Sequence, residues 1–214
     1  MASEKQILDN LSTSISTWNN RLMMRSVGEA VEANIPLERI VTEGLGKGME
    51  KIGQMFDDAK IYLSQVVAAA KIMEAALNIL NVGDNIPDEM YRGVVVMGSV
   101  QGDIHEIGKD VCVAMLRGAG YKVIDLGPDV SPERFVEAAR RYNADILGGS
   151  ALMTTTLAMQ QRIVKEVHEN GVNVYMLFGG APCTREWVDE IGGDGYSRNA
   201  PEMTELVNRL LDKN

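Results

Sequence analysis

The chain has 214 residues, of which 45% are hydrophobic and 24% charged, a balance typical of a folded globular protein and not of a disordered one. Its 30 acidic and 21 basic side chains give a formal net charge of −9, which argues against a nucleic-acid-binding surface. No apolar run approaches the roughly 20 residues of a membrane-spanning helix, and the N-terminus lacks a signal-peptide pattern. Two cysteines are too few for a disulfide framework. We therefore expect a cytoplasmic protein without membrane or nucleic-acid partners.

Residues 1 to about 82 carry apolar side chains at helical spacing throughout. Four helices joined by short connections are predicted, which favours an antiparallel bundle. Their apolar stripes run through residues 7–18, 22–31, 37–56 and 63–80.

The third predicted helix contains four glycines, and each glycine inside a helix costs about 0.8–1 kcal/mol relative to alanine. Close packing against a neighbouring helix is the interpretation that we favour. A sharper alternative is a marginally stable bundle that must move during function. The four residues are Gly44, Gly46, Gly48 and Gly53.

Residues 81–90 break the helical pattern and indicate a linker. After it, short apolar runs alternate with helical stretches, which indicates a parallel sheet covered on both faces. We predict an α/β fold in which a helical-bundle domain, residues 1–90, precedes a flavodoxin-like or Rossmann-like domain, residues 91–214. Its five strands are expected near 93–98, 121–127, 144–149, 173–178 and 194–197, with helices opening at Ser131-Pro132 and Asn199-Ala200-Pro201.

Glycine-rich loops follow three of these strands, at the strand ends where open parallel sheets bind ligands. The loops are residues 102–108, 148–156 and 179–182. In a flavodoxin-like strand order, the first two loops flank the crevice at which the order reverses, and the third lies beside it. We therefore expect the three loops to converge on one ligand.

Asp103 and His105 are two residues apart in the first of these loops, so the carboxylate can accept a hydrogen bond from one imidazole nitrogen. The other nitrogen then faces outward as a ligand. Ser150, across the crevice, is expected to hold Asp103. The only other histidine of the sequence is His168, and a conventional zinc site needs three or four protein ligands. A planar, metal-carrying ligand therefore suits this arrangement better than a bare ion.

Three spaced elements resemble the cobalamin-binding signature of corrinoid methyltransferase domains. They are Asp-x-His-x-x-Gly at 103–108, Ser-x-Leu at 150–152 and Gly-Gly at 179–180, separated by 41 and 26 residues. The helical half resembles the cap that precedes this domain in methyl carriers, so the likeness covers nearly the whole chain. The loops at 148–156 and 179–182 look most like corrinoid proteins of the methylamine and quaternary-amine methyltransferase systems.

The resemblance implies roles for individual residues of the three loops. His105 would be the lower axial ligand of cobalt, in place of the cofactor's own nucleotide base, and Asp103 and Ser150 would form a hydrogen-bonded relay behind it. The slot for the displaced nucleotide tail would be lined by Gly108, Leu152, Gly179 and Gly180. The full set of implied cofactor-binding residues is Gly102, Asp103, His105, Ile107, Gly108, Ser150, Leu152, Thr154, Thr155, Gly179 and Gly180.

By the same resemblance, the helical bundle would cover the upper, methyl-bearing face of the corrin. Leu63, Val66 and Met73 are the candidates for contact with the methyl group. The chain has Ser64 at a position where family members often have proline.

The function implied is that of a corrinoid methyl carrier, with the cobalamin or related corrinoid performing the chemistry. A substrate-specific methyltransferase would move a methyl group from a methylated amine to the cobalt, and a second methyltransferase would pass it to a thiol or a folate-type acceptor. A reductive activase is a further expected partner. The chain is not expected to be a complete enzyme by itself.

Two other functions remain open from the sequence: the cobalamin subunit of an adenosylcobalamin mutase, and a non-enzymatic cobalamin sensor. The N-terminal bundle argues against the mutase, and the lack of a DNA-binding or signalling pattern argues against the sensor. A flavodoxin-like domain that binds another ligand is the residual possibility.

Several polar residues near the loops have simpler interpretations. His168 lies at a predicted helix end, where a cation is mildly favourable. Asp125 and Asp129 are interpreted as solvated loop residues, and Cys183 as a packing or surface thiol. For Thr154 and Thr155, helix capping and ligand contact are equally open.

Overall fold

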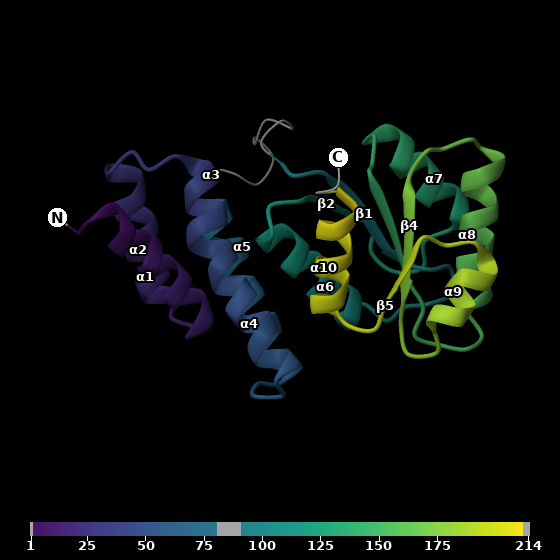
Figure 1. Ribbon diagram of the computed structural model, residues 1–214, viewed down its shortest axis with the longest axis horizontal. Helices are drawn as coiled ribbons and strands as arrows, with labels where there is room; N and C mark the ends of the chain where they lie inside the picture. The colour runs from purple at the N-terminus through teal and green to yellow at the C-terminus, as the bar shows by residue number, and fades with distance from the viewer. Residues whose placement is uncertain (1, 81–90, 212–214) are drawn as a thin grey trace. The chain divides into compact units, whose positions relative to one another are not determined.

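The computed structural model describes residues 2–80 and 91–211, and its internal contacts divide the chain into two compact units (Figure 1). One unit contains the residues up to Tyr91 together with Ala114–Gly120, and the other contains Arg92–Val113 and the residues from Tyr121 onward. The linker predicted over residues 81–90 lies outside the described residues. Within the described ranges, no helix is long and apolar enough to cross a membrane.

The first unit is helical, as predicted. It contains α1 (Glu4–Ser16), α2 (Asn20–Glu32) and α5 (Leu63–Ile79), and between the last two a run of three consecutive helical segments. These segments are α3 (Leu37–Arg39), η1 (Ile40–Gly46) and α4 (Lys47–Asp57). Helix α1 packs against α2, η1, α4 and α5, and the buried apolar side chains between them include Leu11, Ile15, Val27, Ile52, Val66 and Met73.

The third helical stretch departs from the single α-helix that we predicted, because its seven-residue segment η1 is π-helical. Two of the four glycines in this stretch lie directly against α1. A Cβ atom at Gly48 would lie 2.6 Å from Cβ of Ile15, and one at Gly44 would lie 3.0 Å from Cδ1 of Leu11. These distances support the close-packing interpretation for both positions.

The ends of the first helices carry polar caps. Ser3 and Asn19 accept hydrogen bonds from backbone N–H groups in the first turns of α1 and α2. Trp18 lies beyond the end of α1 with a φ of 53°, a left-handed conformation that is uncommon for a bulky residue. Its indole Nε1 donates a 2.7 Å hydrogen bond to the carbonyl of Gln65, which ties this turn to the beginning of α5.

The second unit contains the predicted five-stranded parallel sheet, with strand order β2-β1-β3-β4-β5. The sheet order reverses between β1 and β3, so a switch point lies at the carboxyl ends of these two strands. The observed strands begin and end within two residues of the predicted ones: β1 (Val94–Ser99), β2 (Lys122–Asp125), β3 (Ile146–Ser150), β4 (Tyr175–Gly179) and β5 (Gly195–Ser197).

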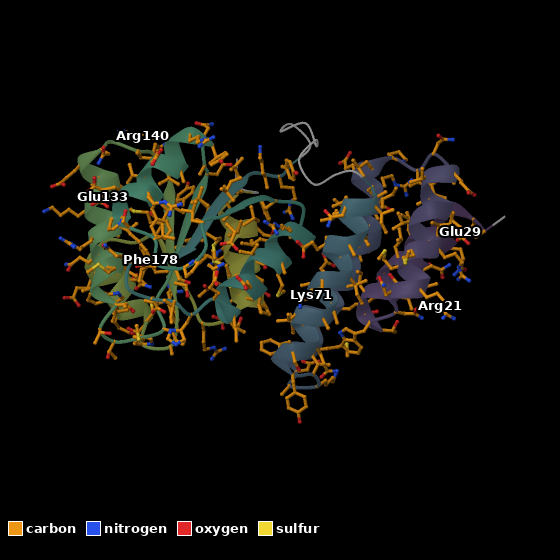
Figure 2. The ribbon with its side chains drawn as sticks, turned by 180° about the vertical axis from the view of Figure 1, so that it is seen from behind. Arg21, Glu29, Lys71, Glu133, Arg140 and Phe178 are labelled. Atoms are coloured by element: carbon orange, nitrogen blue, oxygen red, sulfur yellow. The ribbon has the colours of Figure 1, made fainter. Side chains whose placement is uncertain are left out.

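Helices cover both faces of the sheet (Figure 1). Helices α7 (Pro132–Arg141), α8 (Ala158–Glu169) and α9 (Arg185–Ile191) lie on one face, and α6 (Ile107–Gly118) and α10 (Ala200–Leu211) lie on the other. Figure 2 shows Phe178 of β4 inside this unit, whereas Glu133 and Arg140 of α7 point outward. Phe178 belongs to the apolar core between the sheet and α7, α8 and α9.

The predicted helix starts in this unit are confirmed by their caps. The hydroxyl of Ser131 accepts from the backbone N–H of Arg134 at the start of α7, with Pro132 as the first helical residue. Asn199 Oδ1 accepts a 2.9 Å hydrogen bond from the N–H of Glu202 at the start of α10.

Candidate functional site

The loop between β1 and α6 makes a tight turn that brings its acidic residue inward and its histidine outward. Gly102 has a φ of 81°, in the left-handed region that favours glycine. Asp103 is fully buried, whereas the side chain of His105 is 46% exposed. His105 Nδ1 lies 2.8 Å from Asp103 Oδ1, so the predicted pairing of these two residues is present.

The second oxygen of Asp103 binds the turn that follows β3. Asp103 Oδ2 accepts hydrogen bonds from the backbone N–H of Leu152 at 2.7 Å and of Met153 at 3.3 Å, and from the hydroxyl of Thr156 at 2.8 Å. Asp103 Oδ1 also accepts from the backbone N–H of His105 at 3.1 Å. One buried carboxylate therefore joins the histidine loop to the loop across the crevice.

These hydrogen bonds keep Asp103 ionised. Burial alone would raise its pKa, but the hydrogen bonds from Thr156, His105 and Leu152 outweigh burial and lower the pKa to about 2. An ionised carboxylate can only accept hydrogen bonds, so His105 Nδ1 carries a proton, and a neutral imidazole in this tautomer has its lone pair on Nε2.

The predicted hydrogen bond between Ser150 and Asp103 is replaced by that of another hydroxyl. Among the residues that the structure describes, the hydroxyl that donates to Asp103 belongs to Thr156. The carbonyl of Ser150 accepts a hydrogen bond from Val100 N–H. The reason is the turn after β3: it brings buried Thr156 back under Asp103, while Ser150 ends the strand. Thr154 and Thr155, the two neighbouring threonines, are exposed.

The surface around His105 is apolar. Ile104 is 74% exposed, Ile107 is 65% exposed and Leu152 is 45% exposed, which is unusual for large apolar side chains. Gly108 also lies on the surface, and a Cβ atom there would meet nothing within 4 Å. The fold itself therefore does not require glycine at this position. Among the residues that the structure describes, no group of three or more His, Cys, Asp and Glu side chains is arranged to hold a metal ion.

The two glycines at the end of β4 are sterically required. A Cβ atom at Gly180, which has a φ of 118°, would lie 1.8 Å from the carbonyl oxygen of Ala151, and one at Gly179 would lie 2.7 Å from that of Ser197. Buried Gln160 of α8 donates 3.0 Å hydrogen bonds to the carbonyls of Gly149 and Gly179. The ends of β3 and β4 are thus joined by a side chain that the sequence did not identify.

Asp125 and Asp129 are exposed, as predicted, but their side chains also make hydrogen bonds that support the site. Asp129 has a φ of 53°; its Oδ1 accepts from Gly102 N–H at 2.7 Å and its N–H donates to the Asp103 carbonyl at 2.9 Å. Asp125 accepts two hydrogen bonds from the buried ammonium of Lys109. Sequence reasoning missed Lys109, although a lysine directly after the Asp-x-His-x-x-Gly pattern was visible.

The predictions for His168 and Cys183 agree with the structure, whereas the predicted contact of Leu63, Val66 and Met73 with a methyl group is untested and stays a prediction. His168 is exposed in the last turn of α8. Cys183 is buried, and burial raises the pKa of its thiol to about 11. Val66 and Met73 are buried within the helical unit.

In comparisons with known proteins, family models with the same description match both parts of the chain. Models described as B12 binding domain match residues 93–205 and residues 7–81. The chain is 40% identical to dimethylamine corrinoid protein 2 of Methanosarcina acetivorans, with 99% of each chain covered. It is 35% identical to trimethylamine corrinoid protein 1 of the same species, with 99% of this chain and 100% of that protein covered.

Solved structures agree with the sequence comparisons. The methanol:cobalamin methyltransferase complex of Methanosarcina barkeri matches with a TM-score of 0.86 and 25% identity, over 99% of this chain and 82% of that one. The monomethylamine corrinoid protein of the same species matches with a TM-score of 0.55 and 32% identity, over 97% and 100% of the two chains. The outward histidine, the buried aspartate behind it and these full-length likenesses lead to one conclusion: the chain belongs to the B12-binding corrinoid proteins of the methylamine methyltransferase systems.

Proposed function

We propose that this chain carries a methyl group on the cobalt of a bound corrinoid, between a methyltransferase specific for a methylated amine and a second methyltransferase. The observation that carries the proposal is the geometry of His105: its Nδ1 is held by Asp103 and its ring is half exposed on an apolar surface. The full-length likeness to dimethylamine and trimethylamine corrinoid proteins supports this choice of donor.

The residues of this surface fit a corrinoid. A corrin ring supplies four nitrogen ligands to its metal, so one protein nitrogen suffices, and His105 is the side chain whose Nε2 is free for that role. The exposed side chains of Ile104, Ile107 and Leu152 offer apolar surface to a large ring. Gly108 leaves open space in which a ligand can approach the backbone closely.

The bound corrinoid supplies the cobalt that accepts and releases the methyl group. The chain's own residues orient and tune the ligand below it. Asp103 holds the proton on Nδ1, which leaves Nε2 to coordinate the metal, and the turn at 152–156 fixes Asp103 through three donors. Gly108, Leu152, Gly179 and Gly180 are proposed to line the slot for the nucleotide tail, and Thr154 and Thr155 are proposed as further contacts of the cofactor.

The wider proposal includes the parts of the system outside this chain. The methyl acceptor is proposed to be a thiol or a folate-type compound, reached through the second methyltransferase, and a reductive activase is proposed to restore the reduced cobalt. Residues 1–90 are proposed to form the helical cap domain, and residues 91–214 the cobalamin-binding α/β domain. The cytoplasmic location expected from the cysteine usage belongs to the same proposal.

The first experiment tests His105 as the ligand. Protein labelled with ¹⁵N-histidine is loaded with cobalamin, the cobalt is reduced to Co(II), and its electron paramagnetic resonance (EPR) spectrum is recorded. A ¹⁵N ligand from the protein splits each cobalt line into a doublet, whereas the ¹⁴N of the cofactor's own base splits it into a triplet. We expect the doublet in the native protein and in His168→Ala, and its loss in His105→Ala.

The outcome separates the parts of the proposal. A doublet that persists in His105→Ala would remove His105 from the ligand role, and a native protein that binds no corrinoid would overturn the function. The second experiment presents the loaded, reduced protein to methylated-amine methyltransferases with mono-, di- and trimethylamine and, as the contrasting donor, methanol. Methylation with methanol alone would contradict the proposed donor class.

A further inference from the structure

Lys109 is a charged side chain buried where the fold does not obviously need one. It lies in the first turn of α6, and its side chain is 0% exposed. A cation near a helix N-terminus is disfavoured by the helix dipole, and removing an ammonium from water is costly. An apolar side chain of similar length would avoid both penalties, so the lysine requires another explanation.

The ammonium of Lys109 is surrounded by carboxylates. Its Nζ lies 2.7 and 2.8 Å from the two carboxylate oxygens of Asp125 and 2.6 Å from Asp110 Oδ1, and Glu106 Oε1 lies 3.7 Å away. Burial alone would lower the pKa of Lys109, but the hydrogen bonds to Asp110 and Asp125 outweigh burial and raise the pKa above its ordinary value. Lys109 is therefore a permanent cation that joins α6 to the end of β2.

The hydrogen bonds continue from Asp125 to the backbone of the histidine. Asp125 Oδ1 accepts from Gly127 N–H at 3.0 Å, and the Gly127 carbonyl accepts from Ser99 N–H at 3.0 Å. The buried hydroxyl of Ser99 then donates to the carbonyl of His105 at 2.7 Å. Because His105 and Lys109 are four residues apart in sequence, these bonds close a ring around the segment 105–109.

We propose that Lys109 is a positioning residue for His105, acting through this ring and not through contact with the ligand. The inference rests on the proposed function, because the position of His105 matters for a cobalt ligand. The ring holds the segment at both of its ends: Ser99 fixes the carbonyl of His105, and Asp125 fixes the side chain of Lys109. The imidazole is then held by Asp103 on a backbone segment that is hydrogen-bonded at both of its ends.

The test removes the charge while keeping the length of the side chain. Lys109→Met is compared with Lys165→Met, which removes an exposed lysine of α8 that lies 3.7 Å from Glu169. In the cofactor-free protein, we expect the amides of His105 and Ser99 to exchange with deuterium about tenfold faster in Lys109→Met, because two carboxylates lose their buried partner. Lys165→Met should leave both amides unchanged.

The second measurement is the EPR spectrum of the Co(II) cobalamin-loaded protein with ¹⁵N-histidine. We expect the histidine doublet in the native protein and in Lys165→Met, and a mixture with the triplet of the cofactor's own base in Lys109→Met. A merely structural lysine would lower stability and leave the doublet intact, and that result would overturn the inference. If the native protein itself showed no doublet, the proposed function would fail first, while the exchange data would still test the ring.

Ser99→Ala keeps the inference testable if Lys109→Met does not fold. This variant breaks the ring at the other end, because it removes the hydroxyl that donates to the His105 carbonyl. We expect the same mixed spectrum, and we expect Ser99→Ala combined with Asp125→Asn to have less than the summed effect of the two changes. A fully additive pair would show that the two ends act separately, which contradicts the ring.

Discussion

The hydroxyl of Thr156 donates a 2.8 Å hydrogen bond to Oδ2 of Asp103, 53 residues earlier in the chain. The same Thr156 oxygen lies 3.0 Å from the carbonyl of Met153, so it joins the buried carboxylate to the turn after β3. Ser150, whose hydroxyl was expected in this place, ends the strand instead. The support behind His105 therefore comes from the turn and not from the strand end.

Replacement of Thr156 by valine is expected to destabilise the protein more than replacement of Ser150 by alanine. Valine keeps the shape of threonine but removes one donor from a buried charge, so we expect the free energy of unfolding to fall by ~1–2 kcal/mol. Urea unfolding of the cofactor-free chain measures this change. Thr156→Ser retains the hydroxyl and is the matched control. An equal loss in Thr156→Ser and Thr156→Val would show that the methyl group, and not the hydroxyl, matters.

Asp103 should make the stability of the cofactor-free protein depend on acid pH. Its pKa in the folded protein is about 2, below the ordinary value of 3.8, so the folded state favours the ionised form. The resulting stabilisation, roughly 2 kcal/mol, is fully present above pH 3.8 and is lost as the pH falls from there toward 2. Asp103→Asn should be less stable at neutral pH and should lack this part of the acid dependence. Parallel pH profiles for the two proteins would contradict the prediction.

Asp129 holds the turn at Gly102 with its side chain while its own backbone is in the left-handed region. Asp129→Ala loses the hydrogen bond and keeps the strained φ, so we expect a loss of about 1–2 kcal/mol in the free energy of unfolding. Asp129→Asn keeps an acceptor and tolerates the conformation, and it should cost much less. Thermal unfolding of the two variants gives the comparison. If Asp129→Asn lowered stability and Asp129→Ala did not, the hydrogen bond to Gly102 would not be the stabilising interaction that we assign to Asp129.

Two glycines of the helical unit should respond to alanine in opposite directions. At Gly28 of α2 a Cβ atom would meet nothing within 4 Å, so Gly28→Ala should stabilise the protein by ~0.5–1 kcal/mol through its helix propensity. At Gly48 the Cβ atom would lie 2.8 Å from the carbonyl oxygen of Ser12, so α1 would have to move and Gly48→Ala should destabilise. Urea unfolding followed by circular dichroism measures both. If Gly48→Ala left stability unchanged but slowed methyl transfer, the movement hypothesis would replace close packing.

Local patterns in the sequence were sufficient for the fold and for the pair at the centre of the site. Helical and strand periodicities can be recognised over a few residues. They located the helices and strands because burial of one face gives the apolar side chains of each element the period of that element. The Asp103–His105 pair was predictable because two residues in one turn are close in space regardless of the tertiary structure. The π-helical character of η1 was not predicted from these patterns.

The other supports of the site were decided by tertiary structure. Asp103 meets Leu152 and Thr156 across about fifty residues of sequence, and Asp129 meets Gly102 across 27. These pairs exist only because parallel strands bring their carboxyl ends to one edge of the sheet. The sequence alone determined which side chain is paired with Asp103, His105, because the two residues lie two positions apart. Which side chains hold that histidine in place depended on the folded sheet, because hydrogen bonds select partners by position in space and not by spacing along the chain.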